Sequence, residues 1–203
     1  MFLSDRVCHV PHSHPPVETL KSYIWGILPF PDGELAMLEE MCTCTRVGKG
    51  EVLLKEGETA NRMYFVEKGL LFGRVNRDGR DVVNWFADEG DFVTSMYSFI
   101  SRRPAHESIE AVEECILQVI SYDDLQTLYR RSPSFERLGR LLTETDYIQL
   151  EERVLILQSS SAAERYRLFL EREPELYHRI SLGLLSSYLG VSQETLSRIR
   201  AKR

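Results

Sequence analysis

The sequence predicts an α+β protein with an antiparallel β-roll, then one long helix, then a C-terminal helix-turn-helix of the winged-helix-like type. Three observations predict this order. Strand-like runs separated by glycines fill the region from Arg46 to Tyr122, a helical pattern without Gly or Pro follows Pro133, and short capped helical segments end the chain. With 203 residues, 43% of them hydrophobic, the chain can bury a sizeable core in one or two domains.

The composition excludes disordered, collagen-like and disulfide-scaffold proteins. No apolar run approaches the roughly 18 to 20 residues that cross a bilayer, and the N-terminus lacks a basic region followed by an apolar core. We therefore expect a soluble, cytoplasmic protein with no membrane partner. The four cysteines, Cys8, Cys42, Cys44 and Cys115, are too few and too irregularly placed for a disulfide framework.

Residues 1–16 are polar and Pro-rich without periodicity, which predicts a flexible arm. This arm holds Cys8, His9, His12 and His14, ligand types that suit zinc or copper, although an untethered polar tail carries the same residues. We predict no metal site and no cofactor. We expect the roll with its N-terminal helices over 17–133, a dimerisation helix over 134–160 and the helix-turn-helix over 161–203.

Helical spacing of apolar residues predicts a first helix from Val17 to Pro29 and a second from about Asp32. The strand-like runs of the roll then cover 51–55, 63–67, 70–75, 81–86 and 108–121. Asn76-Arg77-Asp78-Gly79 supplies the turn of a hairpin between two of these runs.

After Pro133 the helical period continues to about Gln158, which predicts one long helix. It carries a narrow apolar stripe at alternating spacings of three and four residues, as in a coiled coil. We predict that this stripe forms a seam between two copies of the chain; packing on the roll alone is the alternative. The seam residues are Leu138, Leu141, Thr145, Ile148 and Leu155.

The last stretch predicts three short helices. The first covers 162–173, the second follows a cap at Ser181 and ends near Gly190, and the third follows a cap at Ser192. Leu196 and Ile199 of the third helix face inward, which leaves its polar residues outward.

Charge is distributed unevenly along the chain. The net charge is −6, but from Leu176 to the end five basic residues stand against one acidic residue, a net charge of +4, so the remainder carries −10. A basic end on an acidic protein indicates that this end contacts DNA. Alternatively, the same lysines and arginines only keep the end of a helix soluble, with no DNA contact.

Two short helices joined at Gly190, with small Ser186 where they approach, form a helix-turn-helix pattern. A helix fits the major groove, where Arg pairs with guanine, Gln with adenine, and Glu accepts from cytosine; Arg200, Lys202 and Arg203 suit phosphates. An ordinary helical hairpin with a Glu194–Arg198 surface pair is the alternative. The predicted DNA-binding residues are Ser192, Gln193, Glu194, Thr195, Ser197, Arg198, Arg200 and Lys202.

The segment 184–199, LLSSYLGVSQETLSRI, closely resembles the helix-turn-helix of bacterial regulators of the Crp-Fnr family. Lys49-Gly50-Glu51, 64–69, Asp78-Gly79-Arg80 and 90–93 resemble that family's cyclic-nucleotide-binding β-roll, and the long helix resembles its dimerisation helix. The resemblance implies a homodimer on a palindromic operator that regulates transcription through RNA polymerase.

The sequence departs from cyclic-AMP-binding members of that family. In those members, the segment that follows the stretch resembling 90–93 binds the nucleotide. It carries a Glu that binds the ribose and an Arg that binds the phosphate. At the matching positions this chain has Ser95 and Ala105. An anionic phosphate needs a charged partner, so we expect no control by cyclic AMP. The effector, if one exists, is unknown; its candidate residues are Thr94, Ser95, Ser98, Arg102 and Arg103.

Other functions fit the residues less well. An iron-sulfur sensor needs several cysteines near the N-terminus, where only Cys8 lies, and a metal-dependent enzyme on this roll needs more histidines than His106. We therefore predict no catalytic residues. A small-ligand-binding or interaction module with a degenerate DNA-binding domain is the alternative to a DNA-binding regulator.

Overall fold

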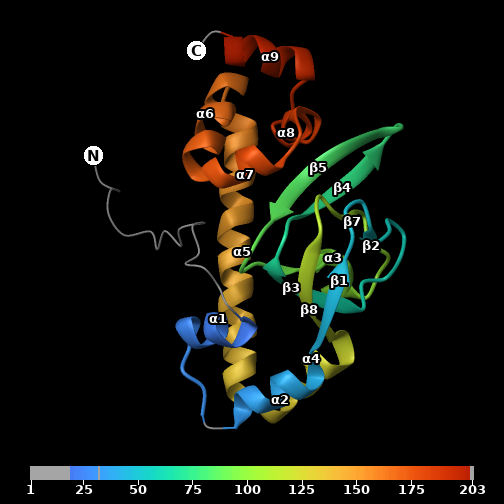
Figure 1. Ribbon diagram of the computed structural model, residues 1–203, viewed down its shortest axis with the longest axis vertical. Coiled ribbons are helices and arrows are strands. Elements are labelled where there is room, and N and C mark those ends of the chain that lie inside the picture. Colours follow the sequence, from blue (N-terminus) through green and yellow to red (C-terminus); the bar gives the residue numbers. More distant parts are fainter. Residues whose placement is uncertain (1–18, 32, 202–203) are drawn as a thin grey trace, which may run out of the picture.

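The computed structural model describes residues 19–31 and 33–201. It holds two four-stranded sheets beside a long helix, with further helices at both ends of that helix (Figure 1). The strands are β1 (Thr43–Val47), β2 (Val52–Leu54), β3 (Arg62–Lys68), β4 (Leu71–Arg77), β5 (Arg80–Ala87), β6 (Phe92–Val93), β7 (Ser108–Ala111) and β8 (Cys115–Ser121). The helices are α1 (Leu20–Ile27), α2 (Glu34–Met41), α3 (Met96–Ser101), α4 (Tyr122–Arg131), α5 (Pro133–Ser159), α6 (Ala162–Arg172), α7 (Pro174–Arg179), α8 (Leu182–Tyr188) and α9 (Gln193–Ala201).

The predicted antiparallel β-roll is confirmed. One sheet has the order β1-β8-β3-β6 and the other β2-β7-β4-β5, and every pair of neighbours is antiparallel. The single run predicted over 108–121 is wrong in one respect, since it holds two strands, β7 and β8, that belong to different sheets. The Asn76-Arg77-Asp78-Gly79 turn is confirmed, because Asp78 and Gly79 both have positive φ, 52° and 79°.

The roll is closed at one end by helices that the sequence only partly predicts. Thr19 and Ser22 form a capping box at α1, and α2 begins after Gly33. Their inward residues Leu20, Ile24, Leu35 and Leu38 join the roll's apolar core together with α4 and the start of α5. The core of the roll is therefore continuous with the first turns of the long helix.

The long helix α5 agrees closely with its prediction. The Ser132 hydroxyl accepts from Phe135 N–H, and Pro133 occupies the first turn, where its missing N–H costs nothing. The assignment of Leu138 to a subunit seam is wrong, because Leu138 is buried in this chain's own roll core. Only the later part of the predicted stripe is left exposed.

A second apolar core holds the C-terminal helices together. Phe169, Leu185, Leu189 and Leu196 meet in it, and Leu70 joins them from the roll. The segment from Glu173 to Ile180 forms the short helix α7 and no strand. This core therefore attaches the helix-turn-helix to the roll as well as to α6.

No helix within 19–31 and 33–201 has the length and apolar character needed to cross a membrane. No three His, Cys, Asp or Glu side chains in the same part of the chain gather as metal ligands would. The predicted arm over 1–16, its Cys8, His9, His12 and His14, and the phosphate contacts Lys202 and Arg203 lie outside the described residues.

Candidate nucleic-acid interface and its attachment to the roll

The geometry of α8 and α9 is that of a helix-turn-helix. The Ser181 hydroxyl accepts from Leu184 N–H at 3.2 Å and begins α8, and the Ser192 hydroxyl accepts from Thr195 N–H at 3.1 Å and begins α9. Gly190 turns the chain between them with φ of 65°, a left-handed value that favours glycine. Both caps and the bend agree with their predictions.

Helix α9 buries one face and exposes the other. Leu196 is fully buried and Ile199 is half-buried, whereas Gln193, Glu194, Ser197, Arg198 and Arg200 are exposed. Thr195 is half-buried, and its hydroxyl lies 2.9 Å from that of Ser192, so this residue belongs to the cap. The exposed face presents the hydrogen-bonding side chains that base edges require.

Arg198 has a partner within α9. Its guanidinium donates to the Glu194 carboxylate one helical turn earlier, and both side chains are about three-quarters exposed. An exposed pair of this kind contributes about 0.3 to 0.5 kcal/mol at most, so base contacts can replace it at little cost.

Arg179 belongs to the roll interface, although the sequence counts it in the basic end. Its guanidinium donates to the Glu89 carboxylate at 2.7 and 2.9 Å and to the Glu113 carboxylate at 2.6 Å. Glu89 also accepts from Gly69 N–H at 2.8 Å. The positive charge of Arg179 is therefore neutralised inside the protein, and no signal in a single sequence indicates this pairing.

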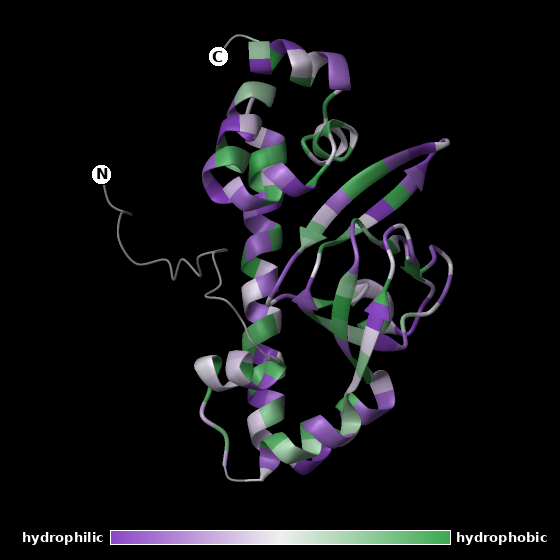
Figure 2. Ribbon diagram, in the orientation of Figure 1, coloured by the Kyte–Doolittle hydropathy of each residue, from purple (hydrophilic) through white to green (hydrophobic). Residues whose placement is uncertain are grey.

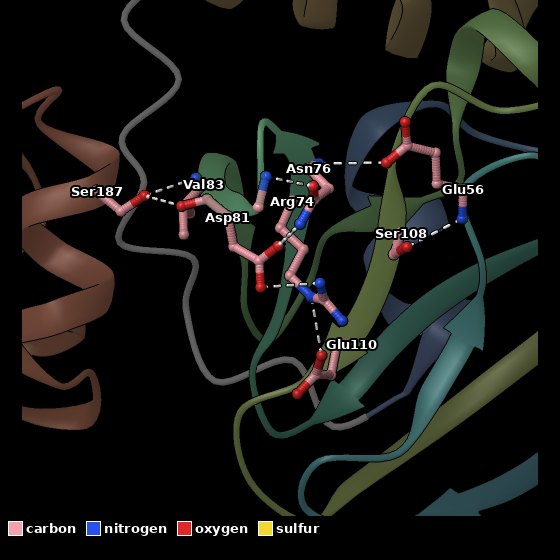
Figure 3. A network of polar contacts seen from close by, with 9 residues as sticks. Glu56, Arg74, Asn76, Asp81, Val83, Ser108, Glu110 and Ser187 are labelled. Carbon is pink, nitrogen blue, oxygen red and sulfur yellow. Dashed lines mark hydrogen bonds and ion pairs between the residues drawn. The ribbon is translucent and has the colours of Figure 1, made fainter.

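A second contact joins α8 to the edge of the roll. The Ser187 hydroxyl accepts from Val83 N–H at 2.9 Å and donates to the Asp81 carbonyl at 3.0 Å, as Figure 3 shows. β5 is the last strand of its sheet, so these bonds satisfy backbone groups that the sheet leaves unpaired. Beside them, the Tyr188 ring packs on Phe86 of β5 at 5.2 Å between centroids.

The Glu89–Arg179 contact predicts a pH dependence of stability. Burial raises the pKa of the Glu89 carboxyl, but the hydrogen bonds from Arg179 and Gly69 outweigh it and hold the pKa below its usual value. The stabilisation is therefore present above the unfolded-state pKa of about 4.3 and is lost as the pH falls through the lower folded-state pKa. We expect Glu89→Gln to lower the free energy of unfolding by about 1 kcal/mol at pH 7, since the site is partly exposed.

Denaturant unfolding between pH 3 and pH 7 measures this effect. The difference in free energy of unfolding between the wild type and Glu89→Gln should shrink towards zero as the pH approaches 3. The control is Glu114→Gln, which changes an exposed residue next to Glu113 of the same interface and should match the wild type at every pH. A deficit that does not change with pH would mean that the carboxylate charge plays no part.

The polar groups of three of the five candidate effector residues, Thr94, Ser98 and Arg102, are engaged in contacts within the chain. The Ser98 hydroxyl accepts from Ala60 N–H and donates to the Arg103 carbonyl, and the Thr94 hydroxyl donates to the Arg62 carbonyl. The Ser95 hydroxyl is buried without a hydrogen-bond partner among the described residues. These three hydroxyls lie inside the roll.

Arg102 lies beside Ser98, since both side chains contact the backbone of Ala60. The Arg102 guanidinium stacks on the Tyr122 ring at 3.9 Å from its centroid and donates to the Ala60 and Phe99 carbonyls. The Arg103 side chain is exposed. A cavity of about 240 Å³ lies nearby, and of the five candidates only Thr94 lines it.

A bulky side chain that sequence reasoning missed packs close to Gly73 on the roll. A Cβ atom on Gly73 would lie 2.3 Å from the Trp85 ring, so the indole rests directly on this glycine. The Trp85 indole N–H donates to the Glu107 carboxylate at 2.9 Å. Gly73 and Trp85 face each other across β4 and β5, a pairing that becomes visible only when the register is known.

Three comparisons agree with this architecture. The family described as cyclic nucleotide-binding domain matches residues 44–132, which covers most of the roll. FixK2 from Bradyrhizobium japonicum has a TM-score of 0.71 at 22% identity, over 79% of this chain and 83% of that one. The c-di-GMP-responsive global regulator CLP of Xanthomonas campestris has a TM-score of 0.69 at 23% identity, over 85% and 91%. These likenesses show the fold.

The relatives found by sequence are regulators. The anaerobic regulatory protein of Haemophilus influenzae is 24% identical over 165 residues, which are 75% of this chain and 63% of that protein. The fumarate and nitrate reduction regulatory protein of Vibrio cholerae is 22% identical over 83% of this chain and 72% of its own length. The chain thus spans less than two thirds of the Haemophilus relative.

The fold and site define a class of protein in which a cyclic-nucleotide-binding-type roll is joined through a long helix to a helix-turn-helix. In fold and in sequence the chain is similar to regulators of the Crp-Fnr family.

Proposed function

We propose that this chain is a DNA-binding transcription regulator of the Crp-Fnr type. The observation that carries the proposal is the division of α9, where Leu196 is fully buried and five polar residues on the opposite face are exposed. The exposed N-terminal half of α9 enters the major groove, where Gln193, Glu194, Ser197 and Arg198 meet base edges. Arg200 and Lys202 contact phosphates.

The regulator acts as a homodimer through α5. Large apolar residues line the exposed part of this helix, an arrangement that favours association with a second copy. Ile148 and Leu155, seven residues apart, are 49% and 61% exposed, and the half-buried Leu141 and Thr145 continue their line. The neighbouring exposed apolar residues are Tyr147, Leu150, Val154 and Leu157. A two-fold axis along α5 gives two recognition helices for a palindromic operator.

Cyclic AMP does not control this regulator. Where the family's cyclic-AMP-binding members carry Glu and Arg, this chain has Ser95 and Ala105, and Ala105 is buried against backbone, with its N–H donating to the Glu58 carbonyl at 2.7 Å. The half-buried Arg102, three residues before Ala105, is already bound to Tyr122 and to backbone carbonyls. A cyclic phosphate placed there would lack a charged partner.

RNA polymerase is the further partner of this proposal, since a bound regulator affects transcription through it. The alternative function is a small-ligand-binding or interaction module whose DNA-binding domain is degenerate. The cavity beside Thr94 favours binding of a small ligand. The Glu194–Arg198 ion pair is also what a helix surface without a DNA contact would show. A DNA affinity that falls steeply with salt concentration and depends on the DNA sequence would support the regulator over the interaction module.

Selection of genomic fragments by the purified protein tests the proposal. The selection is run at two salt concentrations, with a Gln193→Ala/Ser197→Ala variant as control because both side chains are exposed and neither contributes to the core. The proposal expects a palindromic motif enriched by the wild type and lost in the variant. Equal, sequence-independent enrichment by both proteins would favour the interaction module.

Arg198→Ala should relax specificity at one base pair of each half-site. A bidentate Arg–guanine contact discriminates by about 1 to 3 kcal/mol, so the preference at that position should fall by roughly five- to 150-fold. Competition binding with single-base variants of the selected site measures it. A uniform loss of affinity across all positions would instead assign Arg198 to a phosphate.

A further inference from the structure

The hairpin formed by β4 and β5 extends beyond the rest of its sheet. β7 pairs with β4 only over Leu71–Arg74, whereas β4 and β5 stay paired out to Arg77 and Arg80. Residues 75–82 therefore form a two-stranded projection, here called the hairpin arm. Figure 1 shows it reaching from the roll towards the level of α8 and α9.

The arm is fastened beside the helix-turn-helix. The two hydrogen bonds of Ser187 hold the Asp81 carbonyl and the Val83 N–H against the last turn of α8. The bend at Gly190 follows within three residues, and α9 begins at Gln193. Since Arg80 directly precedes Asp81, the tip of the arm begins beside the last turn of α8, the helix that precedes α9 in the helix-turn-helix.

Two of the acidic groups on or beside the arm already have cationic or amide partners. The Asp81 carboxylate accepts from Arg74 Nη1 at 2.9 Å and from Asn76 Nδ2 at 3.0 Å, and the Glu56 carboxylate accepts from Asn76 N–H at 3.2 Å (Figure 3). Arg74 also donates to Glu110 at 3.1 Å. These contacts occupy Asp81 and Glu56. Asp78 lies in the turn between the two arginines at the tip, but within the described residues it forms no ion pair with either of them.

Arg77 and Arg80 are direct cross-strand partners, so their side chains project from the same face of the arm. Both are exposed, and within the described residues neither makes an ion pair. Two like charges directly opposite each other destabilise a hairpin unless an anion lies between them. Figure 2 shows the outer part of the arm as hydrophilic.

The helices around the helix-turn-helix offer few free cations of their own. Of the six arginines in the described part of the chain from 160 to 201, only Arg200 lacks a partner within the protein. The other five arginines are bound to carboxylates or carbonyls: Arg165 to Leu189, Arg167 to Glu171, Arg172 to Glu152, Arg179 to Glu89, and Arg198 to Glu194. DNA affinity depends on neutralised phosphates, so cations outside these helices gain importance.

We propose that Arg77 and Arg80 bind phosphates of the DNA that flanks the half-site contacted by α9. This inference rests on the proposed function, because it assigns a second contact surface to the same DNA. Two adjacent guanidinium groups suit neighbouring phosphate oxygens. The roll is thus part of the DNA-binding surface, and Ser187 fixes its distance from the recognition helix.

The salt dependence of DNA binding tests the inference. Each lost phosphate contact reduces the slope of log affinity against log salt by about 0.9, so Arg77→Ala/Arg80→Ala should lower the slope by about 1.8 per subunit. The affinity deficit should therefore be about tenfold larger at 50 mM than at 200 mM salt for each arm. Arg77→Lys/Arg80→Lys should keep the wild-type slope, because lysine also neutralises a phosphate.

Arg130→Ala/Arg131→Ala is the matched control, since it removes the same charge from exposed positions on α4, away from α9. The control should keep the wild-type slope. On a duplex trimmed to the two half-sites, the arm variant and the wild type should bind equally well.

The outcomes separate the two proposals. If the wild type selects no sequence, the proposed function fails before the arm is tested. If the wild type binds its site and the arm variant keeps the same affinity and slope on flanked DNA, the inference about the arm is overturned. Normal DNA binding with a loss of polymerase recruitment also overturns it and assigns the arm to a protein partner.

Discussion

Ile148→Asp is expected to convert the dimer into monomers and to weaken binding to the selected palindrome by at least about a hundredfold. In a dimer built on α5, the two Ile148 side chains lie near the two-fold axis, where each aspartate would be buried beside a like charge. A buried charge without a partner costs about 3 to 5 kcal/mol, and 3 kcal/mol is already about a hundredfold in affinity.

Sedimentation equilibrium and DNA titration measure this effect. Gln149→Asp is the control, because it adds the same charge to an exposed position one residue further along the helix and away from the Ile148–Leu155 line. Circular dichroism should show the same helix content in both variants, since Ile148 is half exposed in the single chain. An unchanged dimer with Ile148→Asp would place the subunit contact elsewhere.

Leu196→Ala is expected to destabilise the C-terminal helices by about 2 to 5 kcal/mol and to abolish specific DNA binding. Leu196 is fully buried among Phe169, Leu185 and Leu189, and its truncation leaves a cavity in the small core that positions α9. The roll has its own core, so it should remain folded.

The two tryptophans make this prediction measurable. Trp25 lies in α1 and Trp85 in β5, so tryptophan fluorescence follows the roll, whereas ellipticity at 222 nm follows all the helices. With Leu196→Ala, ellipticity should fall at a lower denaturant concentration than fluorescence, and Ile199→Ala, at a half-buried position, should show a smaller separation. Coincident transitions at a lower midpoint would mean that the two cores unfold as one unit.

The elements that local sequence patterns determine were predictable. The helix from Pro133 follows from an unbroken helical period, the hairpin turn from Asp78-Gly79, and the caps of α8 and α9 from Ser181 and Ser192. In each case a few neighbouring residues set the backbone conformation.

The parts that depend on tertiary contacts were not predictable. β1 has four exposed residues out of five, so it lacks the apolar alternation that indicates a strand, and its partner residues in β8 lie 68 to 76 positions further along the chain. Leu138 shares its spacing with the exposed Ile148, and only the packing of α4 and the roll shows that it is core. The sequence places Arg179 in the basic C-terminal end, because its acidic partners Glu113 and Glu89 lie 66 and 90 residues earlier in the chain.

The same limit applies to the candidate site. The exposed residues of α9 follow from helical periodicity once its cap is known, so the predicted base contacts lie on one face. The attachment of α8 to β5 through Ser187 and the position of the hairpin arm require the fold of the roll. A serine near the end of a helix has no sequence feature that distinguishes this role.

The central claim is that two copies of α9 recognise a palindrome as one dimer. Hydroxyl-radical footprinting of the selected site, together with the mass of the complex, tests it most directly. We predict two chains per duplex and two symmetric protected segments whose centres lie about 10 base pairs apart, one turn of DNA. A single protected segment, or one chain per duplex, would contradict it.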